Sequence, residues 1–375
     1  MIEGFDSLLE DSGQPGLPEL HTSLQELLGG PDVTGRVIGR QRLKSRVYRL
    51  QLDANGQICS LVVKRLDPEF AQRNQLVTER WLPAIGLSEC SPPLLGVAAD
   101  RSGQSVWHIY KDLGDRTLAT GDLAPKHVEA AIDLIAQLHI RFAGHPLLPE
   151  CRRYGGDLGI HHFTSNVRDA ICGLELLRPP AIALSSECLA LRDRLLERMY
   201  KLFDERPFRA QALAELGGPE TLLHGDLWTT NIFVLATPNG SQARLIDWDR
   251  VGVGPVSYDL STFLLRFPTH QRLWLLDMYR EAAGSLGQGL PAAPDLNLLF
   301  ETAECARFAN RVIWPAIALL QDRAEWGFDE LAAIEQWFEM LEPVLPLSKA
   351  GQYPVSPGAV QPVTSSARSP VAVAE

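Results

Sequence analysis

The sequence lacks several features that would indicate particular classes of protein. Its 375 residues have a formal net charge of −11, and a chain without an excess of Lys and Arg lacks the electrostatic basis of most nucleic-acid binding. No window approaches the roughly 18 apolar residues of a membrane span. The N-terminus has neither the basic start and apolar run of a secretory signal nor the arginines of a transit peptide. We therefore expect a cytoplasmic protein that binds neither nucleic acid nor membranes.

Paired cysteines are also absent. The chain has no Cys-x-x-Cys spacing, and its six cysteines are scattered at Cys59, Cys90, Cys151, Cys172, Cys188 and Cys305. This pattern argues against zinc ribbons and redox motifs and is typical of reduced, mostly buried thiols. Apolar residues are plentiful, at 45% of the chain, which is enough for a large core in two domains or lobes.

The acidic charge is concentrated at the N-terminal end. Residues 1–35 contain seven Asp or Glu and no Lys or Arg, and residues 346–375 contain two basic residues and one acidic residue, so residues 36–345 have a net charge of only −5. In the leader, Ser23 and Glu26 have the spacing of a capping box and predict the start of a short helix. We expect residues 1–35 to form an acidic appendage and the proline-rich residues 346–375 to be disordered.

The body divides into a strand-rich part and a helix-rich part. Short apolar runs predict strands at 37–38, 47–52, 59–64 and 105–110, with an Asn-Gly turn at 53–56. Asp67 and Pro68 predict a helix that continues to about Trp81. Apolar periodicity predicts helices at 126–142, 186–203, 296–313 and 329–342, with short strands at 221–224, 232–235 and 243–246. The order predicts an α+β fold with a small antiparallel-sheet lobe, residues 36–112, and a larger mainly helical lobe, residues 113–345.

The densest group of polar residues in apolar surroundings lies near the middle of the larger lobe. His224, Asp226 and Asn231 follow one short apolar strand, and Asp247 and Asp249 follow another. Carboxylates beside buried strands are costly unless a cation compensates them. Their oxygens are the hard ligands that Mg²⁺ prefers, with substrate phosphates completing the coordination.

These two motifs resemble the catalytic loop and metal-binding aspartate of the aminoglycoside phosphotransferase and choline-kinase-like small-molecule kinases, which are relatives of the protein kinases. The shared pattern is His224-x-Asp226, with Asn231 five positions after the aspartate, followed by Ile246-Asp247-Trp248-Asp249. The resemblance runs in order over residues 36–320. It implies a bilobal protein-kinase-like fold and transfer of the γ-phosphoryl group of a nucleotide to a hydroxyl of a small molecule.

The resemblance implies roles for the residues of the motifs. Asp226 would orient the acceptor hydroxyl and accept its proton, while Asn231 and Asp247 would hold Mg²⁺. His224 would brace the loop. Further structural support would come from Asp249, either beside the metal or as a strand-end cap, and from Asp259, which caps or braces the loop.

Other matching residues would bind the nucleotide. Lys64 resembles the strand lysine that positions phosphates, and Glu79 resembles its ion-pair partner, with Glu69 on the same predicted helix as an alternative. Tyr110 and Asp112 resemble the hinge between the lobes. ATP is expected and GTP is possible, since such a hinge recognises the base mainly through backbone groups.

One family element is missing. Between residues 39 and 47, where protein kinases have a glycine-rich phosphate loop, Gly39 is the only glycine, so Ser45 or nearby backbone amides are the candidates for phosphate contact. Eleven residues separate Asp247 from Asp259. This short spacing leaves no room for a regulated activation segment and favours a small hydroxylated metabolite or antibiotic over a protein acceptor.

Two other functions compete with the kinase prediction. A non-catalytic nucleotide-binding or scaffold protein would keep the fold, but no catalytic residue is missing. Metal-dependent phosphate-ester hydrolysis usually needs more histidine ligands and often two metals. Arg141, Arg152 and Arg153 are open between steering an anionic substrate and forming a solvated surface. The sequence indicates neither the identity of the acceptor nor the oligomeric state.

Overall fold

The computed structural model describes residues 2–5, 14–30, 33–119, 124–179, 182, 185–238 and 240–346. The chain forms two compact units. The first contains Met1–Ala71 and Leu94–Asp112, and the second contains Gln72–Pro93 and Leu113–Pro346. The predicted proline-rich tail, apart from Pro346, lies outside the described residues.

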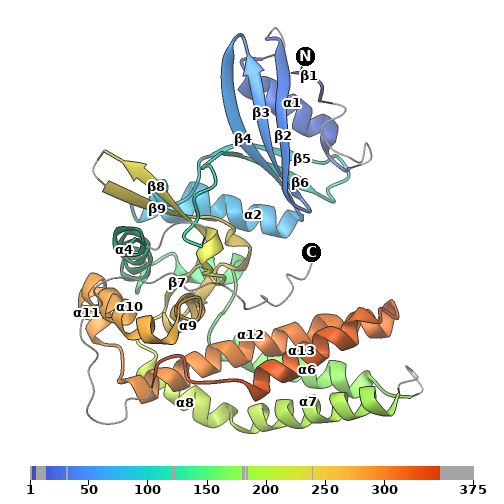
Figure 1. Ribbon diagram of the computed structural model, residues 1–375, viewed down its shortest axis with the longest axis vertical. Coiled ribbons are helices and arrows are strands. Elements are labelled where there is room, and N and C mark those ends of the chain that lie inside the picture. Colours follow the sequence, from blue (N-terminus) through green and yellow to red (C-terminus); the bar gives the residue numbers. More distant parts are fainter. Residues whose placement is uncertain are drawn as a thin grey trace. The chain divides into compact units, whose positions relative to one another are not determined.

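The first unit is built on a six-stranded sheet with the strand order β1-β2-β3-β4-β6-β5. All neighbouring strands are antiparallel except β1, which runs parallel to β2. Alternation along β3 and β4 turns Leu50, Leu52 and Val63 into the core, where they pack with Trp107. The strands (Figure 1) are β1 (Ile2–Glu3), β2 (Gly35–Lys44), β3 (Val47–Ala54), β4 (Gln57–Leu66), β5 (Leu94–Ala99) and β6 (Val106–Lys111).

The leader belongs to this unit, contrary to the expected appendage. Helix α1 (Leu17–Leu27) packs on β5, and its Leu20 and Leu24 are completely buried. The helix begins after Gly16 and has a proline in its first turn, so Ser23 lies inside it and the capping-box prediction is wrong. Pro18 supplied the stronger start signal, because its fixed φ suits the first helical turn.

The second unit is mainly helical and contains more helices than predicted. Helix α2 (Pro68–Leu76), which runs from the end of the first unit into the second, begins at the predicted residue and continues through a π-helical turn (Val77–Trp81) into α3 (Leu82–Ala84). The helices that follow are α4 (Pro125–Phe142), α5 (Leu148–Tyr154), α6 (Ile160–Leu176), α7 (Ser186–Asp204), α8 (Arg206–Leu216), α9 (Ser257–Leu264), α10 (Thr269–Ala282), α11 (Gly284–Gln288), α12 (Ala293–Gln321) and α13 (Trp326–Glu339).

Two groups of helices organise this unit. Helix α4 buries the apolar stripe that its sequence predicts, including Val128, Ile132 and Ile135, at the centre of the largest core. Helices α6, α7, α12 and α13 lie side by side around a separate core (Figure 1). Within the described ranges, no helix combines the length and apolar character that crossing a membrane requires.

Two small antiparallel sheets connect α4 to the polar motifs. Strand β7 (Thr221–Leu223) pairs with β10 (Gly252–Gly254), and β8 (Ile232–Thr237) forms a hairpin with β9 (Gly240–Leu245). Helix α4 packs against both sheets. The segments after β7 and after β9, which carry the predicted catalytic residues, therefore start from buried and fixed strands.

Candidate active site

His224 links the two polar motifs. Its ring is completely buried, and its Nε2 lies 2.9 Å from the carbonyl oxygen of Ile246, the residue before Asp247. Because a carbonyl only accepts, Nε2 carries the proton, and Nδ1 accepts the backbone N–H of Asp226 at 3.3 Å. The ring also packs on Trp248, with centroids 4.6 Å apart. The imidazole of His224 thus joins the start of this loop to the segment after β9 that carries Asp247.

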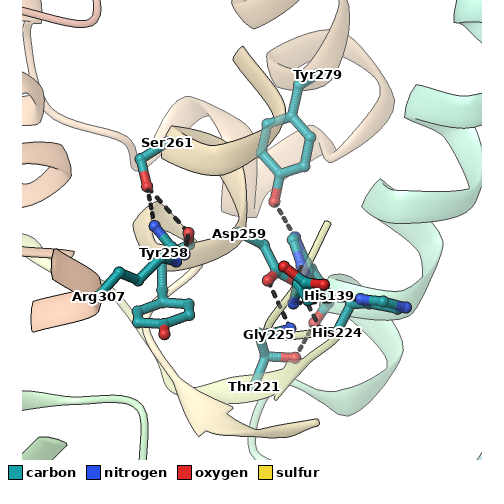
Figure 2. A network of polar contacts seen from close by, with 10 residues as sticks. His139, Thr221, His224, Gly225, Tyr258, Asp259, Ser261, Tyr279 and Arg307 are labelled. Atoms are coloured by element: carbon teal, nitrogen blue, oxygen red, sulfur yellow. Dashed lines mark hydrogen bonds and ion pairs between the residues drawn. The ribbon is translucent and has the colours of Figure 1, made fainter. Parts of the chain in front are cut away.

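Asp259 holds the same loop from the other side (Figure 2). Its carboxylate accepts the backbone N–H of His224 at 2.7 Å and of Gly225 at 2.9 Å. His139 Nε2 lies 3.4 Å from the carboxylate, and the hydroxyl of Tyr279 lies 2.9 Å from His139 Nδ1. Burial raises the pKa of Asp259, but the hydrogen bonds and charges of His139, His224 and Gly225 outweigh it and hold the pKa below its ordinary value. The carboxylate is therefore ionised and fixed.

Gly225 occupies a position that no other residue fits. Its φ is +82°, and a Cβ built there would lie 1.9 Å from the carbonyl oxygen of Arg250. The catalytic loop can approach the segment after Asp249 this closely only because residue 225 lacks a side chain. The sequence motif contains this glycine, but its backbone contact is visible only in the structure.

Asp226 is half-buried and is oriented by Asn231. The Nδ2 of Asn231 donates to the backbone oxygen of Asp226 at 3.0 Å and to its Oδ2 at 3.3 Å. Toward the described residues, the other carboxylate oxygen of Asp226 makes no hydrogen bond. One oxygen of this carboxylate is therefore held by the loop, and the role of Asp226 as proton acceptor stays a prediction.

Asn231 and Asp247 lie at the same end of the β8–β9 hairpin. The backbone N–H of Ile246 donates to the carbonyl oxygen of Asn231 at 3.0 Å, which continues the ladder past the end of both strands. Asp247 adopts a left-handed backbone conformation, with φ 68° and ψ 61°, that is uncommon outside glycine and asparagine. The turn directs the chain sharply away from β9 immediately after the buried Leu245.

These two residues fit a magnesium ion in their chemistry. The amide nitrogen of Asn231 donates to Asp226, so its amide oxygen is the atom that would bind a metal together with a carboxylate oxygen of Asp247. Mg²⁺ is commonly bound by one or two protein oxygens and substrate phosphates rather than by a complete protein cage. Over the described ranges, no group of three or more His, Cys, Asp and Glu side chains is arranged to hold a metal.

Asp249 makes contacts that sequence reasoning missed. Its Oδ1 accepts Asn74 Nδ2 at 2.7 Å, and the Oδ1 of Asn74 accepts the backbone N–H of Trp248 at 3.3 Å. Arg73 donates to the backbone oxygen of Asp249 and, through Nε, to Tyr154 O at 3.0 Å. Asn74 is buried near the end of α2, and no local pattern marks a helical asparagine as the clamp of a distant segment.

Lys64 and Tyr110 lie in neighbouring strands of the first unit. Lys64 is half-buried in β4 and is paired in register with Val47 of β3 and His108 of β6. Burial, followed by the charge of Lys64, lowers the pKa of His108 to about 4. The hydroxyl of Tyr110 lies 2.8 Å from His108 Nδ1. The sheet thus holds the Lys64 ammonium beside a neutral imidazole, and its action on phosphates stays a prediction.

Ser45 lies in the two-residue turn between β2 and β3. The turn is fixed by neighbours in the same unit, because Arg65 N donates to Arg46 O at 2.9 Å and Arg46 pairs with Asp67 at 3.1 Å. A tight hairpin therefore stands where protein kinases have a glycine-rich loop. Its phosphate contact stays a prediction.

Asp112 has a bracing contact beyond its predicted hinge role. Its Oδ2 lies 2.9 Å from Arg49 Nε and accepts the hydroxyl of Ser60 at 2.7 Å, so one carboxylate joins β3 and β4 to the end of β6. Glu79, in the second unit, is exposed and accepts Gln75 Nε2 at 2.8 Å. The pairing of Lys64 with Glu79 rather than Glu69 stays a prediction.

The arginines singled out in the sequence are engaged in contacts of their own. Arg152 pairs with Asp157 at 3.1 Å and with Glu220 at 2.6 Å. Arg141 donates to the carbonyl of Ile85 and to Gln137, and Arg153 lies over the ring of Tyr154. These contacts favour structural parts for the three side chains.

Comparison with known proteins decides the family. Residues 40–296 match the model of the phosphotransferase enzyme family, which is well over half of the chain. The chain belongs to this family. No curated protein matches it significantly by sequence.

Solved structures with a similar fold include three small-molecule kinases. A spectinomycin phosphotransferase in complex with ADP and spectinomycin has a TM-score of 0.53 at 14% identity, covering 87% of this chain and 95% of that one. An ethanolamine kinase of Plasmodium vivax has a TM-score of 0.52 at 12% identity over 81% of each chain. A choline kinase from Streptococcus pneumoniae has a TM-score of 0.50 at 12% identity, covering 87% of this chain and 99% of that one. At these identities the likeness concerns the fold, and it confirms the predicted bilobal α+β kinase-like architecture of this phosphotransferase.

Proposed function

We propose that this phosphotransferase transfers the γ-phosphoryl group of ATP to a hydroxyl of a small molecule, with Mg²⁺ as cofactor. The observation that carries the proposal is the set of hydrogen bonds that positions Asp226, Asn231 and Asp247. The amide nitrogen of Asn231 orients Asp226, and its amide oxygen would bind the metal. Asn231 and Asp247 lie at the same end of the β8–β9 hairpin. Membership of the phosphotransferase enzyme family supports the reaction class.

In the proposed reaction, the acceptor hydroxyl oxygen forms a bond to the γ-phosphorus as the bond from that phosphorus to the β–γ bridging oxygen breaks. The hydroxyl proton moves to the free carboxylate oxygen of Asp226, and ADP leaves. The protein contributes positioning and charge rather than covalent chemistry. Bound Mg²⁺ would neutralise charge on the phosphates, held by Asn231 and Asp247.

Each remaining residue has a supporting part in this proposal. Lys64 positions the phosphates from β4. Tyr110 and Asp112 contribute the backbone at the end of β6 that recognises the base, and Ser45 or its neighbouring amides approach the phosphates. His224 and Asp259 keep the loop in place so that Asp226 does not have to reorganise during the reaction. The scaffold alternative gains no support, because every residue of the catalytic motifs is present.

The test is acceptor-dependent formation of ADP by the purified protein with Mg²⁺ and ATP, using a panel of hydroxylated sugars, amino alcohols, hydroxy acids and aminoglycosides. Phosphorus NMR of the product should show a new phosphate monoester. Asp226→Asn should lower kcat by about 10² to 10⁴-fold, because it removes the proton acceptor. The matched control is Asp53→Asn, near the end of β3 beside the exposed Asn55-Gly56 turn, where activity should not change. A monoester formed equally fast by Asp226→Asn would contradict the assigned role.

A further inference from the structure

Trp228 and Arg266 form an exposed pair directly beside Asp226. Trp228 lies two residues after Asp226 and donates its backbone N–H to the Asp226 carbonyl at 2.8 Å. Its side chain is 40% exposed, although the flanking Leu227 and Thr229 are buried. The guanidinium carbon of Arg266, which follows α9, lies 3.9 Å from the centre of the Trp228 ring. The catalytic loop therefore presents an aromatic ring covered by a cation.

The N–H donors of the Arg266 guanidinium are not bonded to other described side chains or backbone. Toward the described residues it makes no hydrogen bond or ion pair, and its contact is the ring of Trp228. A guanidinium has five N–H donors in a planar fork that matches a carboxylate or a phosphate. An exposed arginine normally leaves these donors to water, but stacking on Trp228 fixes the plane of this one.

The neighbouring charges are already paired or bound. Arg307 lies over the ring of Tyr258 and donates to Ser261 and to the Tyr258 carbonyl (Figure 2). It also pairs with Glu304. Glu304 is buried and also accepts the hydroxyl of Ser261. Arg272 donates to two backbone carbonyls, those of Phe267 and Val344.

Arg266 therefore remains as a cation near Asp226 whose guanidinium these contacts leave unoccupied. Arg266 is attracted electrostatically by Asp226 and Glu304 and repelled by Arg307 and Arg272. It is thus close enough to Asp226 to feel its charge, while making no hydrogen bond to it. The proposed reaction uses Asp226 for the acceptor hydroxyl, which leaves Arg266 for another part of the same molecule.

We propose that the acceptor of this phosphotransferase carries an anionic group, a carboxylate or a phosphate, that Arg266 binds while the ring of Trp228 packs against the body of the molecule. The inference rests on the proposed function and specifies its substrate class. Arg266 is a specificity-determining residue in this account. A cationic acceptor such as an amino alcohol would place its charge against the guanidinium and bind less well.

The experiment measures ADP formation with acceptors matched in skeleton and different in charge. One series is glycerol, glycerate and glycerol 3-phosphate, and another is ethanolamine and serine, within a larger library of hydroxylated compounds sorted by charge. We expect the anionic compounds to be turned over fastest. Comparison of glycerate with glycerol 3-phosphate shows whether Arg266 binds a carboxylate or a phosphate. For the best acceptor, Arg266→Gln should raise KM about 10- to 100-fold, the loss expected for a hydrogen-bonded charge pair, while the KM for ATP stays unchanged.

Two further variants separate a binding role from a folding defect. Arg266→Lys keeps the charge and should recover part of the affinity, and Trp228→Leu should raise KM for the same acceptor. The control is Arg206→Gln, because Arg206 also lies over an aromatic ring, at 4.6 Å from that of Phe203 in another helix, and should leave KM unchanged.

Three results would overturn the inference: preferred turnover of neutral or cationic acceptors, no turnover of any anionic compound by a protein that binds Mg²⁺ and ATP, or an unchanged acceptor KM in Arg266→Gln. Failure to bind Mg²⁺ and ATP at all would instead refute the proposed function, so the two failures are distinguishable.

Discussion

The loop that contains Asp226 in the second unit and the β3–β4 turn in the first unit share two structural features but differ in burial. Each has a glycine with positive φ, Gly225 at +82° and Gly56 at +81°. Each has an aspartate that accepts backbone N–H groups, Asp259 for the loop and Asp53 for the turn. In the loop both residues are buried against other backbone, whereas in the turn Gly56 is exposed and Asp53 is half-buried. The same pair of residue types therefore forms a simple chain reversal in one place and holds the buried loop before Asp226 in the other.

The largest effect should come from replacing the two glycines. Gly225→Ala brings a Cβ to 1.9 Å from the Arg250 carbonyl, whereas Gly56→Ala meets nothing within 4 Å. We expect Gly225→Ala to lower the free energy of unfolding by about 4 kcal/mol or more and to abolish activity. Gly56→Ala should cost about 1 kcal/mol, the strain of positive φ alone. Chemical denaturation of both variants measures the difference, and equal losses would show that the close approach does not matter.

The aspartates should differ next. Asp259→Asn leaves one buried N–H of His224 or Gly225 without its charged acceptor and disturbs the contact to His139, which should cost about 3 kcal/mol. Asp53→Asn should cost about 0.5 kcal/mol or less, because water replaces the lost interaction. Urea unfolding of the pair checks this, together with activity of the folded fraction. A loss in Asp259→Asn no greater than in Asp53→Asn would contradict the bracing role.

His108 in the first unit and His162 in the second should have a smaller effect on stability, and this effect depends on pH. Burial and the charge of Lys64 lower the pKa of His108 to about 4, and burial with Arg307 and Arg250 lowers that of His162 to about 4. As the pH falls, the unfolded chain binds these protons before the folded chain does. The free energy of unfolding therefore decreases between pH 6.5, the ordinary pKa of histidine, and about pH 4. Below about pH 4 the two groups cause no further loss. Each histidine should contribute on the order of 2–3 kcal/mol to this loss.

The histidine prediction is checked by unfolding His108→Asn and the wild type across this pH range. The variant should show the shallower decline, since one of the two groups is gone. An unchanged slope would mean that His108 is protonated as easily in the folded state as in the unfolded state.

The smallest effect should be at Ser45. Its turn is held by the backbone hydrogen bond from Arg65 to Arg46 and by the ion pair of Arg46 with Asp67, and the backbone oxygen of Ser45 lies 3.4 Å from the Tyr48 hydroxyl. Ser45→Ala should change the free energy of unfolding by less than about 0.5 kcal/mol and raise the KM for ATP only a few-fold. A loss of more than a hundred-fold would give the hydroxyl a larger part in phosphate binding than we propose.

The sequence could predict what depends on short-range pattern. The Asn-Gly turn, the apolar stripe of α4 and the order of the motifs were all readable, and they led to the fold class and the family. The helix start at Pro18 overruled the expected cap at Ser23, because a fixed proline φ outweighs a side-chain hydrogen bond. Strand β5 and helix α6 were not predicted, although the buried residues of α6, among them Phe163, Val167 and Leu174, recur at helical spacing.

Long-range contacts of the site could not be predicted. Asn74 reaches Asp249 across 175 positions of sequence, and His139 reaches Asp259 across 120. No local pattern distinguishes these side chains from ordinary helical residues. The same holds for Arg266. Its proposed role depends on its contact with the ring of Trp228 and on the ion pairs and hydrogen bonds that neighbouring charged residues already make. The sequence instead drew attention to Arg152, which the structure pairs with two carboxylates.

The most direct test of the account is the thermal stability of the purified protein with Mg²⁺ plus ATP, Mg²⁺ plus GTP, or neither, in the wild type, Asp226→Asn and Asp247→Asn. Asparagine tolerates the positive φ of position 247, so that variant should fold. A ligand that binds only the folded state must raise the melting temperature. We predict a Mg²⁺-dependent rise with ATP in the wild type and in Asp226→Asn, and its loss in Asp247→Asn. No rise with either nucleotide at millimolar concentration, or a full Mg²⁺-dependent rise in Asp247→Asn, would contradict the account.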